Sequence, residues 1–209
     1  MISILLVDDH DLVRQGLRQL LEIEPDFTIV AEVATGEAAY TAYFKHHPDI
    51  VLLDINLPGE SGLSTTRRLL ARAEHANILA LSMYDDPAIV SRALESGARG
   101  YISKSVSPAE LKQAVIAVAS GNPYLEKRLG DQLQKRSASD INPSQLLTDR
   151  EFEVFTLLAE GHTVNEIADL LHLSSKTVGA HHTSIMKKLG LKNSAQLVRV
   201  GITWGLISV

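Results

Sequence analysis

The 209-residue sequence predicts a doubly wound, five-stranded parallel α/β sheet followed by a small all-α helix-turn-helix domain. Three observations lead to this fold class. Short apolar runs alternate with helical patterns in the first part of the chain, a polar stretch follows, and only helical patterns occur after it. We therefore expect a sheet domain at residues 1–121, a linker at 122–145 and a helical domain at 146–209.

The sheet domain is expected to contain five strand and helix pairs. The predicted strands are 2–8, 27–33, 50–54, 78–83 and 99–103, and the predicted helices are 11–24, 36–47, 62–73, 87–96 and 108–119. Helix starts are indicated by a Ser107 and Glu110 capping box and by Asp86 before a first-turn proline. Gly97, Gly100 and Gly121 suit helix ends and turns. The linker can hold a short helix near 125–135.

The last segment shows helix signals only. A second capping box, Thr148 with Glu151, starts a helix that ends at Gly161. A second helix is expected at 165–171, and a third runs from a turn at 173–175 to residue 189. Two helices across such a short turn form a helix-turn-helix, whose second helix enters the major groove of DNA. The buried side of that helix is predicted to be Val178, Ile185 and Leu189.

The composition limits the classes of function. The chain has no cysteine, which excludes disulfides, thiol catalysis and cysteine-ligated metal sites. No stretch is long and apolar enough for a membrane span, and the amino terminus lacks the features of a signal peptide. We therefore expect a cytoplasmic protein that does not contact a membrane. With 45% hydrophobic residues, the chain can bury a core in each of two domains.

The charges are unevenly distributed along the chain. Residues 1–120 carry 10 Lys and Arg against 16 Asp and Glu, whereas residues 146–209 carry six of each sign. Within the last segment, positions 148–169 hold one Arg and six acids, and positions 174–199 hold five basic residues and no acid. One face of the helical domain can therefore meet a polyanion.

Three carboxylates follow two of the predicted strands. Asp8 and Asp9 come at the end of the first strand, and Asp54 closes the third. The carboxyl ends of parallel strands meet at one edge of the sheet, where ligands bind in a crevice. Carboxylates held close together repel one another unless a cation neutralises them. We therefore predict a Mg²⁺ site formed by Asp8, Asp9, Asp54 and the backbone carbonyl of Asn56.

Asp54 is the expected nucleophile, because it stands alone at the end of its strand and its carboxylate can attack phosphorus. Lys104, after the fifth strand, can supply a second positive charge, and Ser82, after the fourth, can offer a hydroxyl to phosphoryl oxygens. A single Asp at a strand end usually only caps the following helix. The coincidence of all these positions at one sheet edge favours a phosphoryl-accepting site.

Residues 1–121 resemble the receiver domain of bacterial two-component response regulators. The residues that carry the resemblance are those strand-end residues, the loop Leu57-Pro58-Gly59 and Gly62. One departure is Ser105, which stands where many receivers carry a proline.

The resemblance to receivers implies roles for these residues. Asp54 would accept a phosphoryl group from a histidine kinase, and Lys104 would bind that group. Asp8 and Asp9 would hold Mg²⁺, and the switch pair would be Ser82 and Tyr101. A half-buried tyrosine usually only packs, so Tyr101 has a structural alternative.

The last segment resembles the LuxR-type DNA-binding domain, and its combination with a receiver resembles the NarL/FixJ-type response regulators. The matching positions are Leu147 to Glu151, Gly161, Glu166-Ile167-Ala168, Leu173-Ser174, Lys176-Thr177-Val178, His181 and Lys188-Leu189-Gly190. The resemblance implies four partners: a cognate histidine kinase, double-stranded DNA, RNA polymerase and a second copy of the chain when phosphorylated.

The third helix of this domain supplies the predicted DNA contacts. Basic residues would hold the phosphates, namely Lys176, Lys187, Lys188 and Lys192. Other side chains could meet base edges or a thymine methyl, namely Thr177, Ala180, His182 and Thr183. His181 and Ser184 complete the set of candidates for this side.

The same helix departs from its relatives at Gly179-Ala180, where a lysine and a larger apolar residue are frequent, and at Thr183, where another basic residue is frequent. We therefore predict weak DNA binding by the monomer. The adjacent pair of His181 and His182 diverges by about 100° on a helix, which favours a packed His181 and an exposed His182 over a metal site.

The expected mechanism is a population switch in which phosphorylation of Asp54 promotes dimerisation and frees the DNA-binding domain. One alternative is an adaptor that acts through a protein partner or binds DNA only with a co-regulator. A metal-dependent aspartyl phosphatase is disfavoured, because the sequence shows no separate acid/base group for turnover. We therefore expect a protein that is not an enzyme. The sequence leaves open the cognate kinase, the signal, the target genes, activation or repression, and the receiver face of the dimer.

Overall fold

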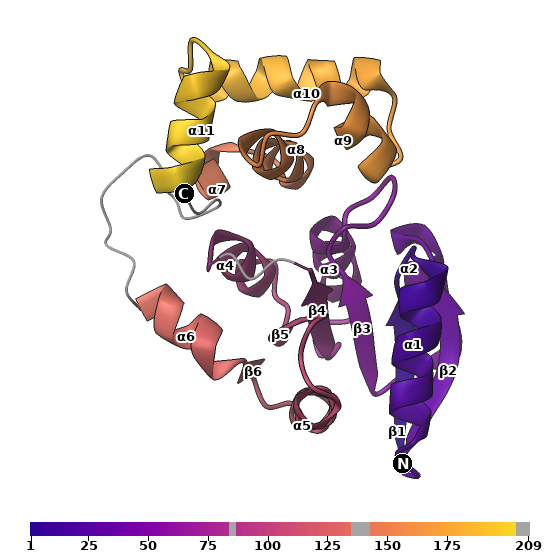
Figure 1. The fold of residues 1–209 in the computed structure, drawn as a ribbon. Coiled ribbons are helices and arrows are strands. Elements are labelled where there is room, and N and C mark those ends of the chain that lie inside the picture. The colour runs from indigo at the N-terminus through magenta and orange to yellow at the C-terminus, as the bar shows by residue number, and fades with distance from the viewer. Residues whose placement is uncertain (84–86, 135–142, 204–209) are drawn as a thin grey trace. The chain divides into compact units, whose positions relative to one another are not determined.

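The computed structural model describes residues 1–83, 87–134 and 143–203 (Figure 1). The chain divides into two compact units. The first is built from Met1–Asp85 and Val90–Asp131, and the second is built mainly from Gln132–Val209. The domain boundaries expected from the sequence remain predictions, since contacts alone define these units.

A parallel sheet forms the centre of the first unit, in the order β2-β1-β3-β4-β5-β6. The strands are β1 (Ile2–Val7), β2 (Phe27–Val33), β3 (Ile50–Asp54), β4 (Ile78–Ser82), β5 (Gly100–Ser103) and β6 (Tyr124–Leu125). The predicted doubly wound parallel sheet is confirmed, although it has six strands in place of five. The first five begin and end within one residue of their predicted positions.

The additional strand, β6, comes from the segment expected to be linker. It pairs with β5 through Gly100 opposite Tyr124 and Tyr101 opposite Leu125. A Cβ on Gly100 would lie 2.8 Å from the carbonyl oxygen of Tyr124, so a glycine is needed for this close approach. The expectation that Gly100 marks a helix end or turn was wrong, because the residue begins a strand.

Helices cover both faces of the sheet (Figure 1). They are α1 (Asp11–Glu22), α2 (Gly36–His46), α3 (Gly62–Leu70), α4 (Pro87–Glu95) and α5 (Pro108–Ala119). A further helix, α6 (Lys127–Gln134), follows β6. Alternate residues of β1 face opposite cores, as expected for a sheet buried on both sides. Ile4 and Leu6 pack with α1 and α5, whereas Leu5 and Val7 pack with α2 and α3.

The predicted helix boundaries of this unit are largely confirmed. Ser107 and Glu110 form the reciprocal capping box at the start of α5. Gly97 and Gly121 have positive φ after α4 and α5, where helices end. The predicted cap at Asp86 lies outside the described residues.

The second unit consists of helices. They are α7 (Pro143–Leu146), α8 (Asp149–Ala159), α9 (Val164–Leu170), α10 (Ser175–Lys188) and α11 (Ser194–Thr203). The three predicted helices correspond to α8, α9 and α10, and Thr148 with Glu151 forms the predicted capping box of α8. Val178 and Ile185 of α10 are buried, while Leu189 is half-buried. Among the helices of residues 1–83, 87–134 and 143–203, none is long and apolar enough to cross a bilayer.

Candidate functional site

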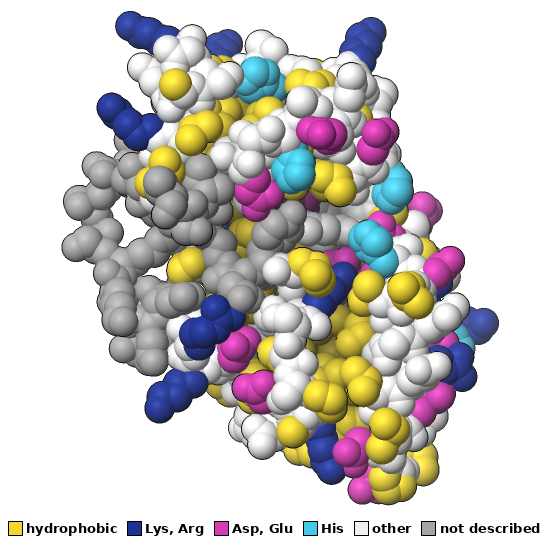
Figure 2. Space-filling view, in the orientation of Figure 1, with side chains coloured by type: hydrophobic (Ala, Val, Ile, Leu, Met, Phe, Trp, Pro, Cys, Tyr) yellow, Lys and Arg dark blue, Asp and Glu magenta, His cyan; other side chains and the backbone are white. Residues whose placement is uncertain are grey.

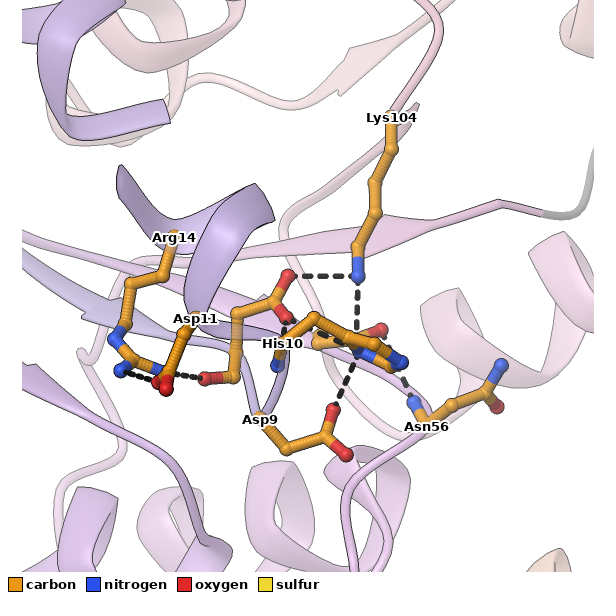
Figure 3. A network of polar contacts seen from close by, with 8 residues as sticks. Asp9, His10, Asp11, Arg14, Asn56 and Lys104 are labelled. Carbon is orange, nitrogen blue, oxygen red and sulfur yellow. Dashed lines mark hydrogen bonds and ion pairs between the residues drawn. The ribbon is translucent and has the colours of Figure 1, made fainter. Parts of the chain in front are cut away.

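Three charged side chains meet at the carboxyl edge of the sheet. Asp8 follows β1, Asp54 ends β3 and Lys104 follows β5. The ammonium nitrogen of Lys104 lies 2.7 Å from Asp8 Oδ2 and 2.6 Å from Asp54 Oδ2, and Figure 3 shows Lys104 extended toward the carboxylates. All three side chains are at most 5% exposed. The prediction that these residues share one edge of the sheet is therefore confirmed.

Burial controls the electrostatics of this cluster. It raises the pKa of Asp54 to about 6, although Lys104 and the backbone N–H of Asn56 work against the shift. Burial also opposes the charge of Lys104, but Asp54 and Asp8 outweigh it and raise the pKa of the ammonium. The ionised form of Asp54 would therefore be stabilised strongly by additional positive charge in the site.

The acidic group has ligands suited to a divalent cation. Asp8, Asp9, His10 and Asp54 each offer one ligand atom, and these atoms all lie within 4.8 Å of one another. Hard carboxylate oxygens of this kind suit Mg²⁺, so the residues fit the ion that receiver domains typically bind. The N–H of Asn56 donates to Asp54 Oδ1 at 3.1 Å, and the role of its carbonyl stays a prediction.

His10 is the member of this group that the sequence analysis missed. Its Nδ1 lies 2.9 Å from Asp9 Oδ1 and 3.5 Å from Asp8 Oδ1. The available signal was its position directly after the two aspartates, at the N-cap of α1.

The two proposed switch residues are both buried in the structure. Ser82 is fully buried, and its carbonyl accepts the N–H of Lys104 at 2.7 Å. Tyr101 is also fully buried. Ser105, the departure from many receivers, donates its N–H to Ser103 Oγ at 3.2 Å, which holds the turn that carries Lys104. The switch roles of Ser82 and Tyr101 stay predictions.

Gly62 lies directly against the backbone of Asp54 and Ile55. A Cβ at this position would collide with the carbonyl oxygen of Asp54 and lie 2.8 Å from Cα of Ile55. The N–H of Gly62 donates to the carbonyl of Ile55 at 2.8 Å, so α3 begins directly against the end of β3. Gly62 is one of the residues that carry the resemblance to receiver domains. The structure explains why this position needs a glycine.

The exposed side of α10 carries the expected basic residues only at its two ends. Figure 2 shows dark-blue side chains at the two ends of this helix and none along its middle. Lys176 and Lys187 are exposed on the helix, and Lys192 is exposed just after it. Ala180 and Thr183 are also exposed. Their DNA contacts stay predictions.

Other side chains of α10 that were predicted to face DNA already contact a neighbour or are partly buried. The Thr177 hydroxyl lies 2.8 Å from that of Ser174, the N-cap. His182 is half-buried, so the expectation that it is exposed was wrong. His181 is half-buried as well, and its burial lowers the pKa of its imidazole.

Glu151 of α8 binds two residues that were predicted to face DNA. Ser184 donates to Glu151 Oε1 at 2.5 Å, and Lys188 donates to Glu151 Oε2 at 2.6 Å. Burial works to raise the pKa of Glu151, but these hydrogen bonds and those from Thr148 hold it at about 2. Ser184 was therefore placed on the wrong side, since its hydroxyl faces α8. The contact of Lys188 with DNA stays a prediction, and in the structure this side chain is paired with Glu151.

A buried cluster of carboxylates and a lysine at the carboxyl edge of a doubly wound sheet, joined to a helix-turn-helix unit, is typical of response regulators. Residues 4–116 match the response regulator receiver domain family, and residues 145–201 match the luxR family of bacterial regulatory proteins. The chain belongs to the NarL/FixJ-type two-component response regulators. This is a family of transcription regulators rather than enzymes.

The chain is similar over its whole length to characterised members. It is 34% identical to the transcriptional regulatory protein DegU of Brevibacillus brevis, covering 100% of this chain and 96% of DegU. It is 36% identical to the oxygen regulatory protein NreC of Staphylococcus aureus, covering 96% of each chain. The structure of RcsB from Salmonella enterica serovar Typhimurium, bound to a promoter with a phosphomimetic, matches with a TM-score of 0.66. That match has 29% identity and covers 100% of this chain and 99% of RcsB.

Proposed function

We propose that a histidine kinase phosphorylates Asp54 and that phosphorylation controls dimerisation and sequence-specific DNA binding, which regulates transcription. The observation that carries the proposal is the contact of Lys104 with both Asp8 and Asp54 in a buried cluster. Such a cluster places a nucleophilic oxygen beside a fixed positive charge, as phosphoryl transfer requires.

The proposed transfer moves a phosphoryl group from a phosphohistidine of the kinase. An oxygen of the Asp54 carboxylate forms the new P–O bond while the P–N bond breaks, and the electron pair stays on the imidazole nitrogen. Lys104 is close enough to pair with the phosphoryl oxygens in place of the carboxylate. A bound Mg²⁺, held by Asp8, Asp9, Asp54 and the Asn56 carbonyl, would neutralise charge on those oxygens.

The added phosphoryl group is proposed to shift a population of conformations. It brings roughly −1.5 to −2 charges into a site that is shielded from water. The Ser82 hydroxyl and the Lys104 ammonium would turn toward it, and Tyr101 would adjust to the movement of Ser82. The receiver surface around β4, α4, β5 and α5 changes, and this favours association with a second copy.

The DNA-binding step uses the exposed side of α10. Lys176, Lys187 and Lys192 would contact phosphates, while Ala180 and Thr183 would meet base edges or a thymine methyl. The promoter complex of the similar protein RcsB, obtained with a phosphomimetic, supports this proposal. The target is genomic DNA, so the protein would act in the cytoplasm and contact RNA polymerase at its promoters.

The test is selection of ligands from a random duplex pool by purified protein, with and without Mg²⁺ and beryllium fluoride. Asp54→Asn is the matched control, because it removes the acceptor and keeps the side-chain volume. We expect one sequence to be enriched by the activated wild-type protein alone. Equal enrichment by the Asp54→Asn variant would refute control by phosphorylation.

A second candidate function is an adaptor that needs a protein partner. Gly179 and Ala180 favour it, because neither residue can supply a charged contact in the middle of α10. The same selection separates the two functions. If no sequence were enriched in either state, the regulator would depend on a co-regulator for DNA binding.

A further inference from the structure

We propose that His10 is a fourth side-chain ligand of the divalent-cation site, giving this receiver a mixed oxygen and nitrogen ligand set. The consequence is a raised affinity for transition-metal ions such as Mn²⁺ relative to Mg²⁺. This inference rests on the proposed cation site of Asp8, Asp9 and Asp54, and it adds His10, which the proposed function does not use.

The backbone brings the imidazole to the site. His10 directly follows Asp9, and its N–H donates to Asp8 Oδ1 at 2.8 Å, so the loop folds back over the end of β1. The ring then extends across the carboxylates, and Figure 3 shows His10 crossing the cluster between Lys104 and Asp9. The loop is also held from the other side, because Arg14 donates to the carbonyl of Asp8 at 2.6 Å.

The distances suit neighbouring ligands of one ion. Bonds of about 2.1 Å in an octahedral site place adjacent ligand atoms about 3.0 Å apart and opposite ones about 4.2 Å apart. His10 Nδ1 lies 2.9 Å from Asp9 Oδ1 and 3.5 Å from Asp8 Oδ1, and the whole group falls within 4.8 Å. No larger movement than a side-chain adjustment is needed to bring these atoms to one ion.

The chemistry of imidazole gives the expected selectivity. A neutral imidazole nitrogen is softer than a carboxylate oxygen and is a common ligand of first-row transition metals, whereas Mg²⁺ prefers oxygen. The side chain of His10 is 58% exposed, so water and ions can reach the nitrogen. A nitrogen ligand therefore strengthens the binding of Mn²⁺ and contributes little to that of Mg²⁺.

The experiment measures binding of Mn²⁺ and of Mg²⁺ to the full chain by calorimetry, together with pulsed EPR of bound Mn²⁺. EPR detects the nitrogen nucleus of a coordinated imidazole directly. Two variants separate ligation from positioning: His10→Asn can still donate a hydrogen bond to Asp9, and His10→Ala cannot. His75→Gln, an exposed histidine after α3, is the matched control.

We expect the nitrogen signal in the wild-type protein and in His75→Gln, and its loss in both His10 variants. The Mn²⁺ affinity of those variants should fall by at least about tenfold, the scale seen when support of a metal site is lost, with little change for Mg²⁺. Absence of the signal from the wild type, or its persistence in His10→Ala, overturns the proposal. A third result also overturns it: His10→Ala lowers the affinities for Mn²⁺ and Mg²⁺ equally, and His10→Asn lowers neither. This result would show that His10 only positions Asp9. If wild-type protein bound neither ion, the cation site of the proposed function would itself fail.

Discussion

At the scale of single residues, the protonation of Asp54, the proposed phosphoacceptor, depends on a balance between burial and paired charge. Asp54 is almost completely buried, which raises its pKa to about 6, and Lys104 counteracts part of this shift. The carboxylate is the nucleophilic form, and it predominates above this pKa. At neutral pH the carboxylate of Asp54 is therefore mainly ionised.

Gly62 is predicted to be required for the position of Asp54. Gly62→Ala should lower the free energy of unfolding of the receiver by about 1–3 kcal/mol, because its Cβ meets backbone atoms of Asp54 and Ile55. Urea denaturation followed by circular dichroism measures the change. Gly16→Ala is the matched control: Gly16 lies within α1 with nothing near its Cβ, so alanine should raise the free energy of unfolding by about 0.5–1 kcal/mol. Similar effects of the two substitutions would contradict the packing argument.

At the scale of elements, Glu151 joins α8 to the recognition helix. It closes the capping box at the start of α8 and also accepts hydrogen bonds from Ser184 and Lys188 near the end of α10. One carboxylate thus fixes the angle at which α10 is presented. The orientation of α10 relative to α8 therefore depends on these hydrogen bonds together with the buried side chains Val178 and Ile185.

The stability of the helical unit should depend on the charge of Glu151. Its pKa is lowered in the folded state from an ordinary 4.5 to about 2. Its contribution is therefore fully present above pH 4.5 and is lost as the pH falls toward 2. Hydrogen exchange of α8 and α10 amides should show protection falling over this range in the wild type. Glu151→Gln should have lower protection at pH 7 and a flatter pH dependence, and an unchanged profile would show that Glu151 does not stabilise the unit.

Two neighbouring lysines of α10 should behave differently toward DNA. Lys187 is exposed, so Lys187→Ala should lower DNA affinity and reduce the slope of log K against log salt by about 1. Lys188 is already paired with Glu151, so Lys188→Ala should change this slope less and should reduce the protection of α10 amides. Fluorescence anisotropy of a labelled selected duplex over a salt series measures both slopes. An equal loss of slope in the two variants would assign Lys188 to DNA.

At the scale of the whole molecule, the proposed function requires two weakly binding helical units to act together on one DNA duplex. The exposed side of α10 has basic residues at its ends only, and a dimer presents two such sides to one duplex. Each of the two compact units buries apolar side chains of its own, such as Leu52 in the first and Phe155 in the second, so the proposed function can assign association to one unit and DNA binding to the other.

The selected DNA site should contain two half-sites about one helical turn apart, or a multiple of it. Inserting 5 base pairs between them turns the half-sites to opposite faces and should lower the affinity of the activated protein by at least about tenfold. Electrophoretic mobility shift with a duplex series measures the change. A spacer of the original length with scrambled sequence is the control. Affinity that is independent of spacing would indicate that the monomer is the binding form.

Local sequence patterns were sufficient to predict most of the fold and the centre of the site. The first five strands could be predicted because the apolar run that indicates each strand lies within a few consecutive residues. Asp8, Asp54 and Lys104 could be placed together because the carboxyl ends of parallel strands share one edge. The capping boxes at Ser107 and Thr148 are equally local, since both partners lie within one turn of helix.

Contacts between groups that are distant in the sequence could be identified only in the folded chain. The two-residue strand β6 is too short for a periodic pattern, and it forms because Gly100 lets Tyr124 approach. Glu151 accepts hydrogen bonds from Ser184 and Lys188, which are 33 and 37 residues away along the chain. The ring of His10 lies over the acidic cluster because the loop after β1 folds back on Asp8. In each case the deciding contact joins atoms whose distance is set by packing, and packing is not encoded in any local pattern.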